Sequence, residues 1–356
     1  MTEYRDRLYL SAIAVIRPCI SRKRSLVPDD NELRVILNRH AVLSGVVLDS
    51  DNAYLLGDGC IDKLYRSASI SKLITAIGVM RMVEKERLSL DAPITSFTPL
   101  RLGNISLRQL LSHTSGLYDP PDYAKASHTL KPLDAVLSTF IFKPGPHPFR
   151  YSNFNFGILG SVIEYVTHQS AEVWMRQNVF EPLCLRGTYD TALAKDASDS
   201  YRVMFPSKPL NIRQRALTAP DILSPAPQYH YRFTAGNLYT DAVSLKLVSK
   251  LLVGNGNGFL SAESVHAMKS THGQYGPSDK QLSYGLGMQI IRNEAYGPET
   301  LYGHQGFAYG SVHMAFFTES SGHTLISLNN GASEARDGRM SRLNHDLLVW
   351  AFGKST

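Results

Sequence analysis

Residues 64–76 read LYRSASISKLITA and place a serine and a lysine, Ser69 and Lys72, three positions apart at the start of an apolar run. Apolar residues then recur at three- and four-residue spacing, which predicts a long helix from about residue 70 to residue 86 with one buried stripe. Residues three apart on a helix share a face, so we expect the two side chains to touch.

Such a pair is suited to be a nucleophile and its base. A serine hydroxyl is a poor nucleophile until a base takes its proton, and a lysine acts as that base only if its pKa is lowered. The amide of a serine at a helix start can also form half of an oxyanion hole. Taken alone, the pattern fits a helix-capping serine and a solvated lysine better, so other motifs must decide.

A second motif follows further along the chain, in Tyr151-Ser152-Asn153. It comes after a Pro144-Gly145 loop and before an apolar helix predicted at residues 156–167. If the loop folds over the start of the first helix, the tyrosine can share a proton with Ser69 and Lys72. The competing interpretation is a tyrosine packed at a domain junction.

A third motif stands near the C-terminus and precedes an expected strand. It reads Gly303-His304-Gln305-Gly306-Phe307. Its small residues would let a substrate lie along the strand edge, and the Phe307 amide could be the second oxyanion donor. Taken alone, the motif would be a turn with a solvent-facing histidine.

The composition is that of a globular protein, with 356 residues, 43% of them hydrophobic and 19% charged. The formal net charge is +6, but the only dense basic run is Arg22-Lys23-Arg24, so we expect no nucleic-acid binding. The cysteines are odd in number and widely spaced, so neither a disulfide framework nor a metal cluster is expected; they are Cys19, Cys60 and Cys184. We therefore expect no metal and no cofactor.

The N-terminus carries a short apolar run at residues 8–16, which faintly suggests a signal peptide. Arg17-Pro18 interrupts it and no small-residue cleavage site follows, so we expect the segment to be retained and the protein to be cytoplasmic. No stretch approaches the roughly 20 apolar residues of a membrane-spanning helix.

Strand patterns near both ends of the chain, with helical patterns between them, favour an α+β fold. We expect an antiparallel sheet flanked by helices, built from residues 1–98 and 233–356, and an inserted, mostly helical subdomain at residues 99–232. A short helix should begin at residue 107 and end near Gly116, and residues 206–227 should form a loop. Further helices are expected at 29–38 and 339–352, and strands at 42–48, 53–56, 284–291, 311–317 and 324–329.

Taken in this order, the three motifs resemble those of the serine β-lactamase and penicillin-binding protein superfamily. The nearer likeness is to its class C branch, with D,D-carboxypeptidases, D-aminopeptidases and family VIII esterases. Residues 105–117 resemble the helix and turn of that family. So do Phe180-Glu181-Pro182-Leu183 and Ala235-Gly236-Asn237-Leu238, and the likeness extends over residues 30–352.

The resemblance implies a role for each motif residue. Ser69 would be the nucleophile, Lys72 its partner and Tyr151 the general base, with the amides of Ser69 and Phe307 as the oxyanion hole. The implied substrate-binding residues are Asn153, His304, Gln305 and Gly306. His304 stands where lactamases usually carry lysine and Gln305 where a hydroxyl residue is common, which argues against an efficient β-lactamase.

The resemblance also touches on two residues outside the three motifs, and it gives neither of them a catalytic role. His113 would belong to a structural turn and take no part in catalysis. Arg336 could meet a substrate carboxylate, although a solvated arginine is the better interpretation of that position alone.

Three functions remain open, all with a small-molecule or short-peptide ligand and an unknown oligomeric state. The first is a peptidase or amidase acting on D-amino-acid compounds, and the second is a carboxylesterase. The third is a non-catalytic binding or assembly protein that kept the fold. An intact Ser69, Lys72 and Tyr151 counts against the third, and substrate choice lies in loops that one sequence does not decode.

Overall fold

The computed structural model describes residues 30–120, 123, 131–141, 147–204, 208–211 and 221–353. The N-terminal apolar run, Cys19 and the Pro144-Gly145 loop lie outside these residues. The first described helix, α2 (Asn31–Arg39), begins two residues later than expected, because the Asp30 carboxylate accepts hydrogen bonds from the backbone amides of Glu32 and Leu33 and caps the helix. Among the described residues, no helix has both the length and the hydrophobicity that crossing a bilayer requires.

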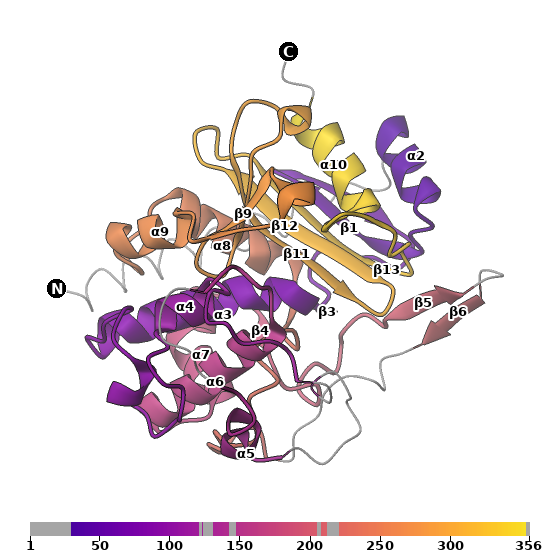
Figure 1. Ribbon diagram of the computed structural model, residues 1–356. Helices are drawn as coiled ribbons and strands as arrows, with labels where there is room; N and C mark the ends of the chain where they lie inside the picture. Colours follow the sequence, from indigo (N-terminus) through magenta and orange to yellow (C-terminus); the bar gives the residue numbers. More distant parts are fainter. Residues whose placement is uncertain are drawn as a thin grey trace.

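An eight-stranded antiparallel sheet forms the upper half of the molecule (Figure 1), in the order β2-β1-β13-β12-β11-β10-β9-β8. The N-terminal strand β1 pairs with β13 from near the C-terminus, with Val47 opposite Ser327. The two ends of the chain therefore share one sheet, and the predicted fold class is confirmed. The strands are β1 (Ser44–Asp49), β2 (Asn52–Leu56), β8 (Gly273–Gln274), β9 (Leu282–Tyr284), β10 (Gln289–Ile291), β11 (Leu301–Ala308), β12 (Ser311–Thr318) and β13 (Thr324–Asn330).

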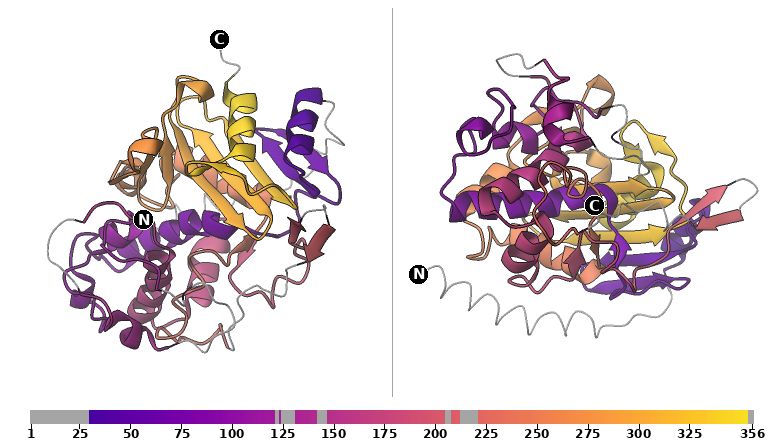
Figure 2. Two further views of the ribbon diagram at one scale, coloured as in Figure 1. Left: turned by 45° about the vertical axis from the view of Figure 1, so that its right-hand side comes forward. Right: turned by 90° about the horizontal axis from the view of Figure 1, so that it is seen from below.

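Helices cover both faces of this sheet. Alternate residues of a strand point to opposite faces, so Phe316 packs with α2 and α10 (Arg342–Phe352), and its neighbour Phe317 packs with the cluster around α3 (Ser71–Lys85) and α8 (Ala242–Val253). Figures 1 and 2 show α2 and α10 side by side on the outer face. Because both faces are covered, all residues of β12 and β13 are buried, and both strands direct apolar side chains to each face.

Other helices gather around α3 on its side away from the sheet (Figure 1). Helix α3 is therefore buried from Ser71 to Met82, not only along the one stripe that its spacing predicted. Gly78 shows how close the packing is, since a Cβ there would lie 2.2 Å from the Met175 sulfur. The surrounding helices are α4 (Leu107–Leu111), α5 (Leu133–Leu137), α6 (Asn153–Thr167), α7 (Ala171–Met175) and the π-helical turn η3 (Arg176–Phe180), with α9 (Ala262–Lys269) beside α8.

Several expected elements differ in detail. The strand predicted at 284–291 is two strands, β9 and β10, because a glycine turn with Gly287 at φ +76° reverses the chain against Ala76 of α3. The motif at 303–307 lies inside β11, not before a strand. Part of the loop predicted at 206–227 forms β6 (Lys208–Asn211), which pairs with β5 (Tyr201–Met204), while 206–207 and 212–220 lie outside the described residues.

Short strand pairs complete the structure. The strand β3 (Tyr65–Arg66), just before the serine motif, pairs with β7 (Tyr239–Thr240), which also pairs with β4 (Gly187–Thr188). A hairpin of β14 (Arg336–Asp337) and β15 (Met340–Ser341) precedes α10. The Ser341 hydroxyl accepts from the Asn344 amide and caps α10, which explains why this helix begins three residues later than predicted.

Candidate active site

A cavity of about 270 Å³ opens where the starts of α3 and α6 meet the edge of β11. Seven residues singled out from the sequence line it, namely Ser69, Tyr151, Asn153, His304, Gln305, Phe307 and Arg336. The other lining residues are Tyr275, Gln289 and Arg339. Three motifs far apart in the sequence thus meet in one cavity, with Lys72 buried next to it.

Ser69 lies in a 3-10 turn, η1 (Ala68–Ile70), that leads into α3. The residue before it, Ala68, has φ +49°, which is uncommon for a residue other than glycine. The turn is held from behind, because the Ser67 amide and hydroxyl both donate to the Leu238 carbonyl, at 2.8 and 2.9 Å. The segment 235–238 therefore fixes the strained conformation that presents Ser69 to the cavity.

Lys72 is fully buried, and its amine has three oxygen neighbours. Its Nζ lies 3.0 Å from Ser69 Oγ, 2.8 Å from Asn153 Oδ1 and 2.7 Å from the Ala235 carbonyl oxygen. Burial lowers the pKa of Lys72 to about 7, although the nearby Asp119 carboxylate opposes this shift. Near neutral pH a large share of the molecules therefore carry an uncharged amine beside Ser69.

The Tyr151 ring packs among other rings at the edge of the cavity, with its centroid 4.5 Å from that of His113. Burial raises the pKa of Tyr151 well above its ordinary value of 10.0, while a hydrogen bond with Ser69 acts in the opposite direction. Tyr151 is therefore a neutral phenol at physiological pH. It is ready to donate a hydrogen bond, but it is a poorer proton acceptor than Lys72.

His113 lies behind Tyr151 and does not line the cavity. Its Nδ1 accepts hydrogen bonds from the Ser152 amide at 3.3 Å and from Asn155 Nδ2 at 3.1 Å. Its pKa is lowered well below 6.5, mainly by burial, so the ring stays neutral. These contacts fix the loop that carries Tyr151 and fit the expected structural role.

Asp119 is a site residue that the sequence reasoning missed. Its carboxylate accepts hydrogen bonds from the Ser152 hydroxyl at 2.7 Å, the Asn153 side-chain amide at 2.8 Å and the Phe154 backbone amide at 2.9 Å. Because Asn153 Nδ2 is bound to Asp119, its Oδ1 must face Lys72. An acid three residues after Gly116 was visible in the sequence, but nothing there indicated its partners.

The edge of β11 beside Ser69 is free of a neighbouring strand, since β10 pairs with it only as far as Gly303. The Gln305 amide points to this side and donates to Gln289 Oε1 at 3.2 Å. Because alternate residues of a strand direct their amides to the same side, the Phe307 amide points to this edge too. A Cβ on Gly306 would lie 2.4 Å from the Ser67 carbonyl oxygen, so only glycine lets the strand run this close to the serine turn.

The side chains of His304 and Gln305 are used inside the protein. His304 Nε2 lies 3.0 Å from the Tyr284 hydroxyl, its Nδ1 lies 2.6 Å from the Gln305 carbonyl oxygen, and burial lowers its pKa to about 3. Gln305 donates to the Arg339 carbonyl at 2.8 Å and accepts from the Ser341 amide. The alternative of a solvent-facing histidine in a turn is thus wrong. This part of β11 has mainly backbone groups to offer a substrate.

A family model described as Beta-lactamase matches residues 57–348, which is more than half of the chain. The chain belongs to the β-lactamase family. Esterase EstB of Burkholderia gladioli is 24% identical over 328 residues, covering 79% of this chain and 80% of the esterase. A D-stereospecific amidohydrolase from Streptomyces sp. superposes with a TM-score of 0.71 at 24% identity, over 92% of this chain and 100% of that one. An octameric penicillin-binding protein homologue from Pyrococcus abyssi gives a TM-score of 0.71 at 21% identity, covering 92% and 78%.

As a member of the β-lactamase family, the protein is a hydrolase of a fold shared by amidases, esterases and penicillin-binding proteins. The family assignment does not single out one of these activities, because the relatives differ in what their names say they act on. A choice between these activities therefore rests on the contacts within the cavity.

Replacing Asp119 by asparagine should lower kcat about tenfold and shift the acid limb of the pH profile of kcat/KM to lower pH. The Asp119 charge raises the pKa of Lys72, so its loss lowers that pKa further. An asparagine also brings its own amide group against that of Asn153, which loosens the amide facing Lys72. The measurement is kcat/KM between pH 5 and 9, with Asp134→Asn as the control, because Asp134 bonds Gln228 and does not line the cavity. A lower rate with an unmoved acid limb would reduce Asp119 to a structural role.

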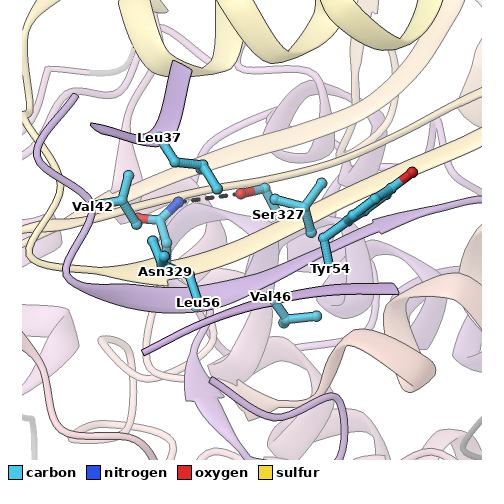
Figure 3. A pocket seen from close by; sticks show the side chains of 9 residues that line it. Leu37, Val42, Val46, Tyr54, Leu56, Ser327 and Asn329 are labelled. Carbon is cyan, nitrogen blue, oxygen red and sulfur yellow. Dashed lines mark hydrogen bonds between the residues drawn. The ribbon is translucent and has the colours of Figure 1, made fainter. Parts of the chain in front are cut away.

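A second, much smaller cavity lies between α2 and the sheet (Figure 3). Its volume is about 10 Å³, at or below what a single water molecule needs. Leu37, Val42, Val46 and Leu56 line it, and its polar side chains bond each other, with Asn329 Nδ2 3.2 Å from Ser327 Oγ. We interpret it as a packing void in the core, not as a ligand site.

Proposed function

We propose that the protein is a serine hydrolase that forms an acyl-enzyme on Ser69, with D-amino-acid peptides or amides as its preferred substrates. One observation carries this proposal. A neutral lysine amine has two hydrogens and one lone pair. Two of the neighbours of Lys72 Nζ, Asn153 Oδ1 and the Ala235 carbonyl oxygen, can only accept hydrogen bonds. They take both hydrogens, so the lone pair is left facing the Ser69 hydroxyl at 3.0 Å.

The first step follows from this geometry. The Lys72 amine takes the Ser69 proton while Ser69 Oγ attacks the carbonyl carbon of the substrate. The carbonyl oxygen becomes an oxyanion that accepts from the amides of Ser69 and Phe307, each worth about 3 kcal/mol in comparable sites. The Tyr151 hydroxyl forms a hydrogen bond with Ser69. It then passes the proton from Lys72 to the leaving group as the bond between the leaving group and the acyl carbon breaks. The resemblance implied Tyr151 as the base, whereas the two pKa values favour Lys72 in that role.

Deacylation reverses the same proton movements. A water molecule gives a proton to Lys72 and attacks the acyl carbon, and the proton returns to Ser69 Oγ as the acyl bond breaks. Each turnover consumes one water and regenerates the starting state of Ser69, Lys72 and Tyr151.

The preference for amides rests on Asn153. Its Nδ2 is bound to Asp119 through one hydrogen and carries a second, which a substrate carbonyl oxygen can accept at the edge of the cavity. The likeness to a D-stereospecific amidohydrolase supports the same preference, and the likeness to esterase EstB supports an esterase as the second candidate. β-Lactams should be poor substrates, because His304 is buried and neutral and supplies no cation beside the nucleophile.

The test is a comparison of kcat/KM for four substrates under one set of conditions. They are a D-Ala-D-Ala peptide, a D-amino-acid amide, p-nitrophenyl butyrate and nitrocefin. We expect one of the two amide substrates to rank first and nitrocefin last. Activity on the ester alone would favour the esterase, and nitrocefin in first place would overturn the order. A fluorophosphonate should label Ser69, and labelling only elsewhere, or equal turnover by Ser69→Ala, would reject the acyl-enzyme itself.

A further inference from the structure

The free edge of β11 is closed at one position by the side chain of Gln289. Gln289 is the first residue of β10, and the chain before it turns away through Gly287, so β10 does not extend to Gln305. In place of a strand, the Gln289 Oε1 accepts the Gln305 backbone amide at 3.2 Å. The Gln305 carbonyl points to the same side of β11 and accepts from His304 Nδ1 at 2.6 Å. Both backbone groups of Gln305 are thus already bonded to side chains.

Gln289 is held in this position from its other end as well. Its Nε2 donates to the Tyr275 hydroxyl at 3.2 Å, and the residue is only 3% exposed although it lines the cavity. The Tyr275 ring packs in turn against Phe149, with the two centroids 4.6 Å apart. Displacing a buried amide that is bonded through both its oxygen and its nitrogen is unfavourable, because these groups would lose their partners away from water. We therefore expect Gln289 to stay in place when a substrate binds.

The position of Tyr151 indicates which part of a substrate meets Gln289. Tyr284 contacts the rings of both Tyr151 and Tyr275, with centroid distances of 6.1 and 6.4 Å. The Tyr151 ring also lies 6.3 Å from that of His304. Tyr151 is therefore on the same side of the site as Gln289 and its partner Tyr275. Because the proposed mechanism has Tyr151 deliver the proton to the leaving group, the leaving group lies at the end of the cavity that Gln289 closes.

The spacing of an antiparallel pair gives the length of leaving group that fits. When the scissile carbonyl accepts the Phe307 amide, the residue that carries this carbonyl lies opposite Phe307. Residues of a strand that bond to the same neighbouring edge are two positions apart. The second residue of a leaving peptide would therefore lie opposite Gln305 and would need the amide that Gln289 already occupies. The first leaving residue makes no backbone hydrogen bond to this edge and is not affected.

We propose that Gln289 is a specificity-determining residue that limits the leaving group to ammonia or a single amino-acid residue. The proposal rests on the proposed acyl-transfer function and narrows its substrates to amino-acid amides and compounds the size of a dipeptide. The Gln289 side chain takes the place of the second leaving residue on the edge of β11. A longer peptide finds neither hydrogen-bond partners nor space at that position.

The experiment uses three D-alanine compounds whose leaving groups increase in length. They are D-Ala-NH2, D-Ala-Gly-NH2 and D-Ala-Gly-Gly-NH2, and all end in a carboxamide, so they do not differ in charge. The quantity measured is kcat/KM for the release of free D-alanine. The length ratio is the value for D-Ala-Gly-NH2 divided by that for D-Ala-Gly-Gly-NH2. Because both values come from one preparation, this ratio does not depend on the fraction of folded enzyme.

We expect a length ratio above about 20 in the wild type, because the second glycine has to displace a buried amide that is bonded at both ends. In Gln289→Ala and in Gln289→Ser the ratio should fall below about 3, since both variants free the Gln305 amide. Gln289→Glu keeps the length of the side chain and an oxygen for that amide, so its ratio should stay close to the wild-type value. Gln228→Ala is the matched control, because Gln228 bonds Asp134 and does not line the cavity.

Two results would overturn the role of Gln289, and they differ from failure of the function. A length ratio near one in wild-type enzyme that releases D-alanine from all three compounds would leave the acyl-transfer function standing and reject the limit on length. A high ratio that persists in both Gln289→Ala and Gln289→Ser would place the limit elsewhere in the site. No release of D-alanine from any of the three compounds would reject the proposed amide hydrolysis, and the limit on its leaving groups with it.

Discussion

Replacing Lys72 by methionine should lower kcat/KM on any accepted acyl substrate by about 10³- to 10⁴-fold, at the upper end of what loss of a general base costs. Methionine has nearly the length of lysine, but its thioether sulfur is far too weak a base to take the Ser69 proton. In the wild type, kcat/KM should rise as the pH increases through about 7, because only the deprotonated amine accepts that proton. In the variant this acid limb should disappear.

The control is Lys246→Met. Lys246 is also buried, but it binds Asp51 and the Ser50 carbonyl and does not line the cavity. A folded Lys246→Met protein should keep its rate to within about twofold. A Lys72→Met protein that retains a tenth of the wild-type kcat/KM, or the same acid limb, would refute the role of Lys72 as base.

The same substitution should change how stability depends on pH. Lys72 has a pKa of about 7 in the folded protein, against 10.5 as its ordinary value. Between these values the unfolded chain holds the proton and the folded protein does not, so the contribution of Lys72 to the free energy of unfolding rises with pH in this window. Below pH 7 both states hold the proton, and the cost of burying the charge is complete and constant.

Urea denaturation of wild type and Lys72→Met at pH 6 to 10 measures this effect. The free energy of unfolding of the wild type minus that of the variant should be flat near pH 6 and should rise from pH 7 to 10. Taking the difference removes the titration of other groups. A flat difference over the whole range would show that the pKa of Lys72 is not lowered.

The parts of the site that the sequence predicted are those set by local geometry. Ser69 and Lys72 come together because they are three residues apart where the η1 turn runs into α3, and their spacing predicted this contact. The helix α6, which begins at Asn153, and the strands β1, β12 and β13 likewise follow from the pattern of apolar residues in their sequences. What the spacing could not predict is how many neighbours an element has, which is why α3 is buried on nearly all sides.

The parts that the sequence did not predict depend on contacts between distant segments. Asp119 fixes Asn153 across 34 residues, and the Arg336 guanidinium lies over Phe307 from a different hairpin. The inward position of His304 follows from the register of β11 and from the Tyr284 hydroxyl that happens to meet it. A single sequence records none of these pairings, so the resemblance gave the residue types of the site but not their hydrogen-bond partners.

Replacing Tyr151 by phenylalanine should lower kcat by about 10²-fold and leave the acid limb near pH 7 in place. The ring contacts with His113 and Tyr284 remain, so the loop should keep its position, but the hydroxyl that bonds Ser69 is lost. The proton on Lys72 then reaches the leaving group only by a longer route. In a double variant with Lys72→Met the two losses should not add, because both residues act on one proton.

Substrates with different leaving groups give the sharpest test of this role. A p-nitrophenolate needs no proton to leave, whereas an amine does, so Tyr151→Phe should lose far more activity on a D-amino-acid amide than on p-nitrophenyl butyrate. The matched control is Tyr189→Phe, which removes a buried hydroxyl that forms a hydrogen bond with Thr75 outside the cavity and should leave both rates within about twofold. Equal losses on the amide and the ester would mean that Tyr151 orients Ser69 and does not carry the proton. Orientation of Ser69 affects every substrate alike, whereas proton delivery matters only to a leaving group that requires a proton.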